Sequence, residues 1–326
     1  MSTLKITVVI PAYRRREFIL QAVDSVLKNE IKSKLQIIVV KNFHDSTVEQ
    51  QLKERDVNVI DSMDDTLGGK VAEAFQESEG DVISILEDDD KFSSNKLMEI
   101  EKVFQDKKVG FFHNAISFID VNGKVIKSPS VGKEILEVPN KTKEENLRMI
   151  HQYKGYHNTS SMTLRSDLAK ALLPYLAKVK LNVDLLLFFG ALKSDYDMVF
   201  TPMKLTQYRK HDSISNKKNF SFTDFLSNNS AFMNTLFDDS FIYRDMMKNS
   251  SFYKYTMAWI EFINKSKTLF SSTSDSELVN SDNTIYDWVP FGKGKNRMIN
   301  LTLKNSLFVR KIILRSLYII GYSVSP

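Results

Sequence analysis

The strand–helix alternation over the first ninety residues constrains the fold of this 326-residue chain more than any other feature of its sequence. Short segments rich in Val and Ile alternate with segments in which apolar residues recur at helical spacing, as over about residues 17–27. Strands are expected at residues 6–10, 35–40, 57–60 and 81–86. Strands separated by helices pair in parallel and carry helices on both faces. The sequence therefore predicts an α/β fold with a Rossmann-like, mostly parallel sheet flanked by helices.

The pattern changes further along the chain. Residues 121–124 carry a hairpin signal, and Pro202 is expected to separate two short strands over residues 198–208. From about residue 215 onward no strand pattern remains. We therefore expect two parts, an α/β catalytic domain over residues 1–215 and a helical C-terminal region over residues 216–326.

Four consecutive acidic residues, Glu87-Asp88-Asp89-Asp90, directly follow the fourth strand. Ligands of parallel sheets bind beyond the carboxyl ends of the strands, so this run should border the binding crevice. In extended backbone, alternate side chains share a face about 6–7 Å apart, which would direct Asp88 and Asp90 together into the crevice. Neighbouring carboxylates repel each other unless a cation lies between them, and a hard divalent cation could then bind a diphosphate. The alternative is a solvated acidic turn before the next helix.

Four segments resemble, in order, the motifs of the family 2 glycosyltransferases. They are Ile6-Thr7-Val8-Val9-Ile10-Pro11-Ala12-Tyr13-Arg14-Arg15, Gly68-Gly69-Lys70-Val71-Ala72-Glu73-Ala74-Phe75, Leu86-Glu87-Asp88-Asp89-Asp90 and Tyr208-Arg209-Lys210-His211-Asp212-Ser213-Ile214-Ser215. The resemblance covers about residues 4–215 and implies a GT-A fold. It also implies a glycosyltransferase that moves a sugar from a nucleotide-diphosphate donor to a hydroxyl acceptor, glycan or lipid-linked, usually with inversion. An Mn²⁺ or Mg²⁺ ion would lie on an Asp-x-Asp element of the acidic run.

The resemblance further implies which residues contact the nucleotide-sugar. They come from the loops after the strands, the glycine-rich helix start, the acidic run and the closing motif: Pro11, Ala12, Tyr13, Arg14, Asn42, Asp45, Gly69, Lys70, Asp88, Asp89 and Arg209. The acidic pair that usually follows the second strand in this family is absent. Asn42 and Asp45 are therefore the candidates for contacting the base or ribose, and the identity of the nucleotide stays open.

The metal ligands implied by the resemblance are Asp88, Asp90 and His211. The acidic motif fits the family in two frames, Glu87 with Asp89 or Asp88 with Asp90, and we favour the second. A lone histidine is more often a structural residue, but the place of His211 in the closing motif favours a ligand role.

An inverting displacement needs a general base for the acceptor hydroxyl. The resemblance places it at the start of a helix, and the matching residue is Asp184, in an apolar run that predicts a helix over residues 183–192. An acidic residue at a helix start also stabilises the helix dipole without any catalytic role. The acid that precedes the base in the family is replaced by Val183, and Asp195 and Asp197 are fallback candidates.

Composition excludes several other classes of protein. The chain has no cysteine, so disulfide frameworks, thiolate metal sites and catalytic thiols are ruled out. The loop after the first strand has no glycine, which argues against a dinucleotide-dependent oxidoreductase and a nucleotidylyltransferase. The net charge is +5, but seven of the 45 basic residues and none of the 40 acidic ones follow residue 287. The body is therefore slightly acidic, and no nucleic-acid partner is expected.

The basic tail has the pattern of an amphipathic helix over residues 299–322. A step of about 100° per residue places Lys304, Lys311 and Arg315 in one stripe, with apolar residues opposite. Such a helix suits peripheral contact with an anionic membrane, and docking on the protein's own core or on a partner subunit is equally compatible. With no export signal and no spanning segment in the sequence, we expect a cytoplasmic protein. The membrane alternative for the tail would make it peripheral at the cytoplasmic membrane face.

A second function from another class stays open. The missing acidic pair after the second strand and the presence of Val183 are compatible with a catalytically silent protein that binds a nucleotide-sugar or glycan on the same fold. Turnover of a nucleotide-sugar in the presence of Mn²⁺ would separate an enzyme from such a binding protein.

Overall fold

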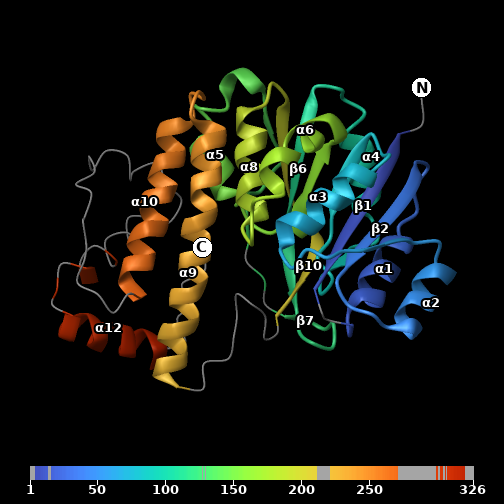
Figure 1. Cartoon of the computed structure of the whole chain (residues 1–326). Coiled ribbons are helices and arrows are strands. Elements are labelled where there is room, and N and C mark those ends of the chain that lie inside the picture. The colour runs from blue at the N-terminus through green and yellow to red at the C-terminus, as the bar shows by residue number, and fades with distance from the viewer. Residues whose placement is uncertain are drawn as a thin grey trace. The chain divides into compact units, whose positions relative to one another are not determined.

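Figure 1 presents the computed structural model of the chain. The structure describes residues 4–13, 16–126, 128, 130–210, 221–270, 299, 302–303, 305 and 307–319. The chain divides into two compact units, Met1–Lys210 and His211–Pro326. The boundary predicted after residue 215 lies outside the described residues.

The first unit is built on one ten-stranded sheet. Its strands are β1 (Lys5–Ala12), β2 (Lys34–Lys41), β3 (Asn58–Asp61), β4 (Val82–Ile85), β5 (Lys91–Phe92), β6 (Val109–Ile119), β7 (Val125–Ile126), β8 (Leu136–Val138), β9 (Met162–Arg165) and β10 (Asp197–Arg209). The order is β3-β2-β1-β4-β9-β6-β10-β5, with β7 beside β6 and β8 beside β10. β1 pairs in parallel with β2 and β4, and β2 pairs in parallel with β3, as predicted.

One inner strand runs against its neighbours. β9 lies antiparallel between β4 and β6, whereas β6 and β10 are parallel. Ser84 is opposite Thr163 and Val82 is opposite Arg165, so the end of β4 faces the beginning of β9. The segment that precedes β9 therefore reaches the same edge of the sheet as the loop that follows β4.

Helices cover both faces of the sheet (Figure 1). They are α1 (Ile19–Leu27), α2 (Ser46–Glu54), α3 (Leu67–Glu77), α4 (Lys96–Val103), α5 (Leu147–Gln152), α6 (Ser166–Ala171), α7 (Leu173–Leu176) and α8 (Val183–Lys193), with short 3₁₀ turns η1 (Asn140–Thr142) and η2 (Thr159–Ser161). Because both faces of the sheet are buried, the strands carry apolar side chains on both sides, and their sequences are nearly continuous runs of Val and Ile.

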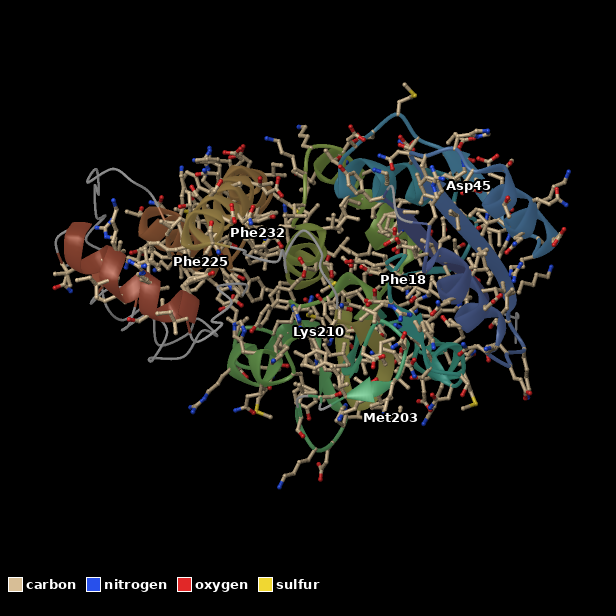
Figure 2. The ribbon with its side chains drawn as sticks, turned by 90° about the horizontal axis from the view of Figure 1, so that it is seen from below. Phe18, Asp45, Met203, Lys210, Phe225 and Phe232 are labelled. Carbon is tan, nitrogen blue, oxygen red and sulfur yellow. The ribbon has the colours of Figure 1, made fainter. Side chains whose placement is uncertain are left out.

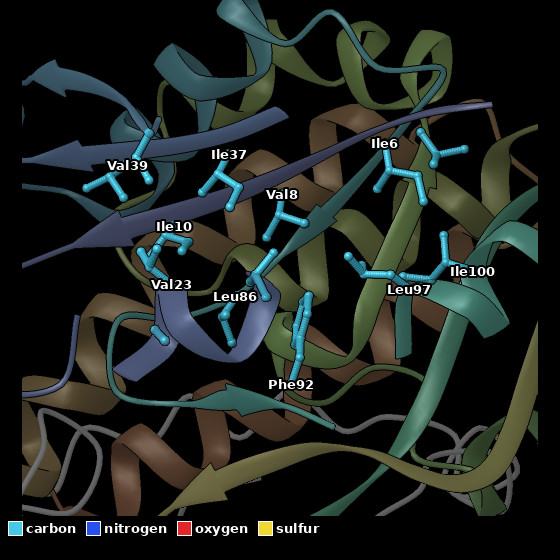
Figure 3. Close-up of a cluster of buried hydrophobic side chains, with 14 of the residues drawn as sticks. Ile6, Val8, Ile10, Val23, Ile37, Val39, Leu86, Phe92, Leu97 and Ile100 are labelled. Carbon is cyan, nitrogen blue, oxygen red and sulfur yellow. The ribbon is translucent and has the colours of Figure 1, made fainter. Parts of the chain in front are cut away.

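The core on one face follows the alternation of side chains along the strands. Ile6, Val8 and Ile10 of β1 share that face with Ile37 and Val39 of β2, and all five are buried. Figure 3 shows side chains from α1 and α4 packed into the same cluster, among them Val23, Leu97 and Ile100. On the other face α3 contacts β1 and β2. This packing fixes the ends of β1, β2 and β4, from which the candidate site is built.

The predicted strands over residues 198–208 form one strand instead of two. β10 continues through Pro202, and its register with β6 shifts between Thr201 and Lys204. A bulge accommodates the proline because proline has no N–H for the ladder. The predicted hairpin turn is confirmed, since β6 pairs antiparallel with β7 and Gly123 has a φ of 82°.

The second unit contains the expected helices. α9 (Phe222–Met247) and α10 (Tyr253–Phe270) pack side by side, and α12 (Leu307–Ile319) contacts α9. A ring cluster joins the three, with Phe225 at 5.8 Å from Phe270 and 5.6 Å from Tyr318 between centroids. Among the described helices, none combines the length and the hydropathy needed to cross a bilayer.

The predicted tail helix over residues 299–322 is described in part, as α12. Lys311 and Arg315 are exposed, in agreement with the predicted stripe, whereas Lys304 lies outside the described residues. Arg310 is 4% exposed and donates to the carbonyls of Thr268 and Leu303 at 3.3 and 3.4 Å.

Candidate active site

The acidic run forms a buried turn after β4. The Asp90 N–H donates to the Glu87 carbonyl at 3.1 Å. Asp88, Asp89 and Asp90 are 2%, 7% and 1% exposed. The expected extended backbone is therefore wrong, because hydrogen bonding between positions 87 and 90 closes the chain. The alternative of a solvated turn is also wrong, because the aspartates are withdrawn from water.

Two distant strands hold this acid turn, residues 87–90, in place. The Tyr13 N–H, just after β1, donates to Asp88 Oδ2 at 3.0 Å. At the end of β10, the Arg209 N–H donates to Asp90 Oδ1 at 2.9 Å, and Arg209 Nε donates to the Asp89 carbonyl at 2.7 Å. The turn is thus fixed from both halves of the sheet.

The segment before β9 contacts the acid turn from a third direction. Asn158 Nδ2 lies 3.4 Å from Asp90 Oδ2, and the Thr159 hydroxyl donates to the Glu87 carboxylate. Ser160 Oγ accepts from the Glu87 N–H at 3.0 Å. Thr159 and Ser160 were not among the predicted site residues. The signal that points to them is the antiparallel direction of β9, which brings its preceding turn to this edge.

Burial changes the acidity of the turn. It raises the pKa of Asp90 to about 7, with repulsion from Asp89 acting in the same direction and hydrogen bonds from Ser160, Arg209 and Asn158 opposing it. The pKa of Glu87 is raised well above its usual range by burial and then by repulsion from the neighbouring aspartates. These carboxyls retain protons at a pH at which solvated carboxylates are ionised.

A buried lysine lies close to this acidic site. Lys96 is 0% exposed, and its Nζ donates to the Ser160 carbonyl and to the Thr206 hydroxyl. Burial lowers the pKa of Lys96 well below its usual range, and the nearby Asp90 opposes that shift. Lys96 therefore holds the segment before β9 against β10.

Asp184 lies at the start of α8, as predicted, and reaches the same edge. Its carboxylate accepts from the Asn158 N–H at 3.2 Å and from the Leu185 N–H at 2.9 Å. Burial raises the pKa of Asp184 to about 6. The two fallback candidates lie elsewhere. Asp197 accepts from the backbone N–H of Asn140 at 2.7 Å, and Asp195 accepts from the Asn140 side-chain amide at 3.5 Å.

The residues predicted after β1 and at the start of α3 lie next to one another. Pro11 and Ala12 are the last residues of β1, and the Lys70 Nζ lies 5.1 Å from the centroid of the Tyr13 ring. Lys70 is 1% exposed and donates to the Asp64 carbonyl at 2.7 Å. Arg14 lies outside the described residues.

The Asp64 side chain packs so closely against Gly69 that there is no room for a Cβ. A Cβ at this position would lie 2.0 Å from a carboxylate oxygen of Asp64. That carboxylate accepts from the Thr66 N–H at 2.7 Å and the Thr66 hydroxyl at 2.6 Å, and Thr66 in turn caps α3 through the Gly69 N–H. The glycine therefore leaves room for the loop that precedes α3.

The two residues predicted to contact the base or ribose have intramolecular partners. Asn42 Nδ2 donates to Asp65 Oδ1 at 2.7 Å. Asp45 caps α2 by accepting from the N–H groups of Thr47 and Val48, and it pairs with Arg16 at 3.1 Å. In Figure 2, Asp45 after β2 and Met203 on β10 lie on opposite sides of the first unit, as the strand order requires.

The Arg209 guanidinium is engaged within the protein. Besides the Asp89 carbonyl, it donates to the carbonyls of Asp120 and Val121 at 3.2 and 2.8 Å and to Gln21 Oε1 at 2.9 Å. Its central carbon lies 4.3 Å from the centroid of the Phe18 ring. This arrangement gives Arg209 a structural role, and its predicted contact with phosphate stays a prediction.

The acid turn supplies donors that suit a hard cation. Within the described ranges, no group of three or more His, Asp or Glu side chains is arranged to hold a metal ion by itself. Asp88 and Asp90 nevertheless offer buried carboxylate oxygens, which are the ligands that Mg²⁺ and Mn²⁺ prefer. The third predicted ligand, His211, lies outside the described residues. The residues present fit a cation that takes its remaining ligands from a diphosphate or water.

The fold and this site define the class of protein. The sheet, its flanking helices and the acid turn after β4 form a GT-A fold. Solved structures agree, since the S. aureus TarS 1-349 structure in complex with UDP superposes with a TM-score of 0.55 at 12% identity, covering 99% of this chain and 93% of that one. The TarS 1-349 structure in complex with UDP-GlcNAc gives a TM-score of 0.52 at 12% identity, with coverage of 99% and 93%.

Sequence comparison gives the family. The model described as Glycosyl transferase family 2 matches residues 7–172, which is half of the chain, and the chain belongs to this family. An uncharacterized glycosyltransferase of Rickettsia bellii (strain RML369-C) is 25% identical over 132 residues, 39% of this chain and 19% of that protein. One from Nostoc sp. (strain PCC 7120) is 30% identical over 134 residues, 39% of this chain and 41% of that protein. The matches thus span less than half of either relative.

Proposed function

We propose that this protein transfers a sugar from a nucleotide-diphosphate donor to the hydroxyl of a glycan or lipid-linked acceptor, with inversion and with Mn²⁺ or Mg²⁺. The observation that carries the proposal is that two carboxyl groups are hydrogen-bonded to the same residue. Asn158 contacts Asp90 of the acid turn through its side chain and Asp184 through its backbone. A metal-dependent inverting transfer needs a carboxylate that holds the cation and a general base, and Asp90 and Asp184 would supply them at one edge of the sheet.

The donor would lie along the edge formed by β1, β2 and β4. Pro11, Ala12, Tyr13, Arg14, Asn42, Asp45, Gly69, Lys70, Asp88, Asp89 and Arg209 are the proposed contacts. Asp88 and Asp90, with His211, would hold the cation, which when bound neutralises charge on the departing diphosphate. Because the TarS structures contain UDP and UDP-GlcNAc, UDP-GlcNAc is the first donor to test.

The acceptor hydroxyl would lose its proton to Asp184. A carboxyl with a pKa of about 6 is largely ionised near neutral pH and still basic enough to take a proton in the transition state. Its hydrogen bonds from the N–H groups of Asn158 and Leu185 fix its direction. Oriented in this way, Asp184 would act on an acceptor that approaches from the side away from the leaving group.

The test combines binding and turnover. Thermal unfolding with UDP, GDP and other nucleoside diphosphates, with and without Mn²⁺, should reveal one nucleotide that stabilises the protein in the presence of the ion. Hydrolysis or transfer of the matching sugar donor should follow, and Asp90→Ala should abolish it. Glu137→Ala, an exposed acid on β8, is the matched control and should leave turnover unchanged.

The alternative is a catalytically silent binding protein on the same fold. It makes a different prediction from the same experiment. Nucleotide-dependent stabilisation without donor cleavage, at any divalent ion tested, would favour the silent protein over the enzyme.

We also propose that α12 contacts the cytoplasmic face of an anionic membrane. Its exposed side chains include Lys311, Arg315, Ile312 and Ile319, the last two at 51% and 74% exposure. Basic and apolar residues exposed on one helix match the chemistry of a headgroup region. Lys311→Glu with Arg315→Glu should abolish sedimentation with vesicles containing anionic lipid while donor cleavage stays intact. Equal binding of this variant and the wild type would refute the proposal.

A further inference from the structure

Asn158 lies between the two groups assigned to chemistry. It is 5% exposed, its Nδ2 lies 3.4 Å from Asp90 Oδ2, and its backbone N–H donates to Asp184 Oδ2 at 3.2 Å. One residue therefore bonds one carboxyl with its side chain and the other with its main chain.

The amide of Asn158 has a fixed direction. The Ser161 hydroxyl donates to Asn158 Oδ1 at 3.2 Å, which leaves the NH₂ group facing Asp90. An asparagine amide accepts on one side and donates on the other, and this position uses both. Aspartate, which has the same shape, would have no donor for Asp90 when ionised.

The backbone of Asn158 is in an uncommon conformation. Its φ is 69° and its ψ is 105°, a combination that a residue with a Cβ rarely adopts. This conformation directs the N–H toward Asp184 and starts the η2 turn, from which Thr159 and Ser160 reach Glu87. Strained residues that persist at a site are held by the contacts that they make there.

We infer that Asn158 is a positioning residue that sets the relation between Asp90 and Asp184. The inference rests on the proposed function, because it assigns those two carboxyls to the cation and to the acceptor. It separates into two parts. The side-chain amide orients Asp90 and so acts on cation and donor binding, whereas the backbone conformation orients Asp184 and so acts on turnover.

Two substitutions at this position separate the parts. Asn158→Gly removes the amide but tolerates a positive φ, so the N–H to Asp184 is kept. It should raise the Mn²⁺ concentration at half-maximal thermal stabilisation, and the KM for the donor, by about 10- to 100-fold, as loss of residues behind metal ligands does. Asn158→Ala also strains the backbone, so kcat should fall further, by up to about 100-fold, as expected for a misplaced reacting group.

Asp56 provides the matched control. It has a φ of 56° in the turn between α2 and β3, it is exposed, and it belongs to the same unit. Asp56→Gly and Asp56→Ala change the backbone strain and remove one exposed carboxylate, so both should shift the melting temperature without affecting kcat, KM or the response to Mn²⁺. Ser161→Ala, which frees the amide of Asn158 without changing its backbone, should reproduce the Asn158→Gly effect in weaker form and serves if that variant is unstable.

The outcomes distinguish this inference from the proposed function. An active wild type whose Asn158 and Ser161 variants keep the Mn²⁺ response, KM and kcat would overturn the inference alone. Equal kcat in Asn158→Gly and Asn158→Ala, together with an altered Mn²⁺ response, would overturn the part that concerns Asp184. A wild type that neither responds to Mn²⁺ nor uses any donor would overturn the proposed function and this inference together.

Discussion

Arg209 donates its backbone N–H to the carboxylate of Asp90 at 2.9 Å, although 119 positions separate the two residues in the sequence. The guanidinium of the same residue bonds the Asp89 carbonyl and the two carbonyls of the β6–β7 hairpin, those of Asp120 and Val121. The end of β10, the acid turn and the hairpin are therefore joined through one side chain.

Replacement of Arg209 by lysine should be destabilising although it keeps the charge. A lysine offers one nitrogen and cannot donate at once to carbonyls on three sides, so buried carbonyls are left without partners. We expect Arg209→Lys to lower the free energy of unfolding by roughly 2–4 kcal/mol, measured by urea unfolding. Lys204→Ala, at an exposed position on the same strand, is the control and should change it by less than about 0.5 kcal/mol.

The pKa of Asp184, about 6, predicts how turnover depends on pH. A general base acts in its ionised form, so kcat should fall as the pH drops through about 6 and be level above about 7. Asp184→Asn should lower kcat by at least about 100-fold with nucleotide binding retained. A kcat that is constant between about pH 5 and 7.5, or an active Asp184→Asn protein, would rule out Asp184 as the base.

The raised pKa of Asp90 predicts how stability depends on pH without a cation. The pKa of Asp90 in the folded protein, about 7, lies above its ordinary value of 3.8, so the folded state favours the protonated carboxyl. Its contribution to the free energy of unfolding is therefore present at low pH and is lost as the pH rises through about 7. Asp90→Asn stays neutral, so in EDTA it should be more stable than wild type near pH 8, by a few kcal/mol at most, and similar near pH 4. Melting temperatures at both pH values test this. An equal difference in melting temperature between Asp90→Asn and the wild type at both pH values would contradict the prediction. Glu137→Gln, which also removes one negative charge, is the control.

The two glycines at the start of α3 should respond differently to alanine. At Gly68 a Cβ would lie 2.2 Å from the Val179 carbonyl oxygen, which is backbone and cannot move without shifting the segment after α7. Gly68→Ala should therefore lower the free energy of unfolding by about 1–3 kcal/mol. At Gly69 the Cβ would meet the Asp64 side chain, which can turn away only by giving up its hydrogen bonds from Thr66. No backbone has to move, so Gly69→Ala should cost less stability than Gly68→Ala but weaken nucleotide binding. Urea unfolding and nucleotide titration of both variants check the difference.

The parallel half of the first unit and the place of Asp184 were predictable because regular patterns specify them. Val/Ile runs alternate with helical segments up to residue 86, and Asp184 precedes an apolar run that is buried over almost its whole length in α8. Local periodicity and helix-start chemistry carry this information without any long-range contact.

The conformation of the acid turn and the role of residues 158–160 were not predictable in the same way. Four acidic residues have no apolar period, so their sequence does not distinguish an extended backbone from the turn that the hydrogen bond between positions 87 and 90 closes. The contacts of residues 158–160 with the acid turn do not follow from the sequence pattern, because the principle that ligands lie at the carboxyl ends of parallel strands does not cover an antiparallel strand. Strand direction is set by pairing with distant segments, which one sequence does not encode locally.

The antiparallel strand between β4 and β6 also orders the events of folding. The acid turn is complete in the chain by residue 90, and its partner Tyr13 precedes it. The other partners come later in the sequence, with residues 158–160 and, last, with Arg209. Closing contacts over such sequence separations is slow, because the loop entropy is lost before the contacts form. We therefore expect the carboxylates of the acid turn to leave water only after nearly the whole first unit has been synthesised, when its final strand, β10, can pair.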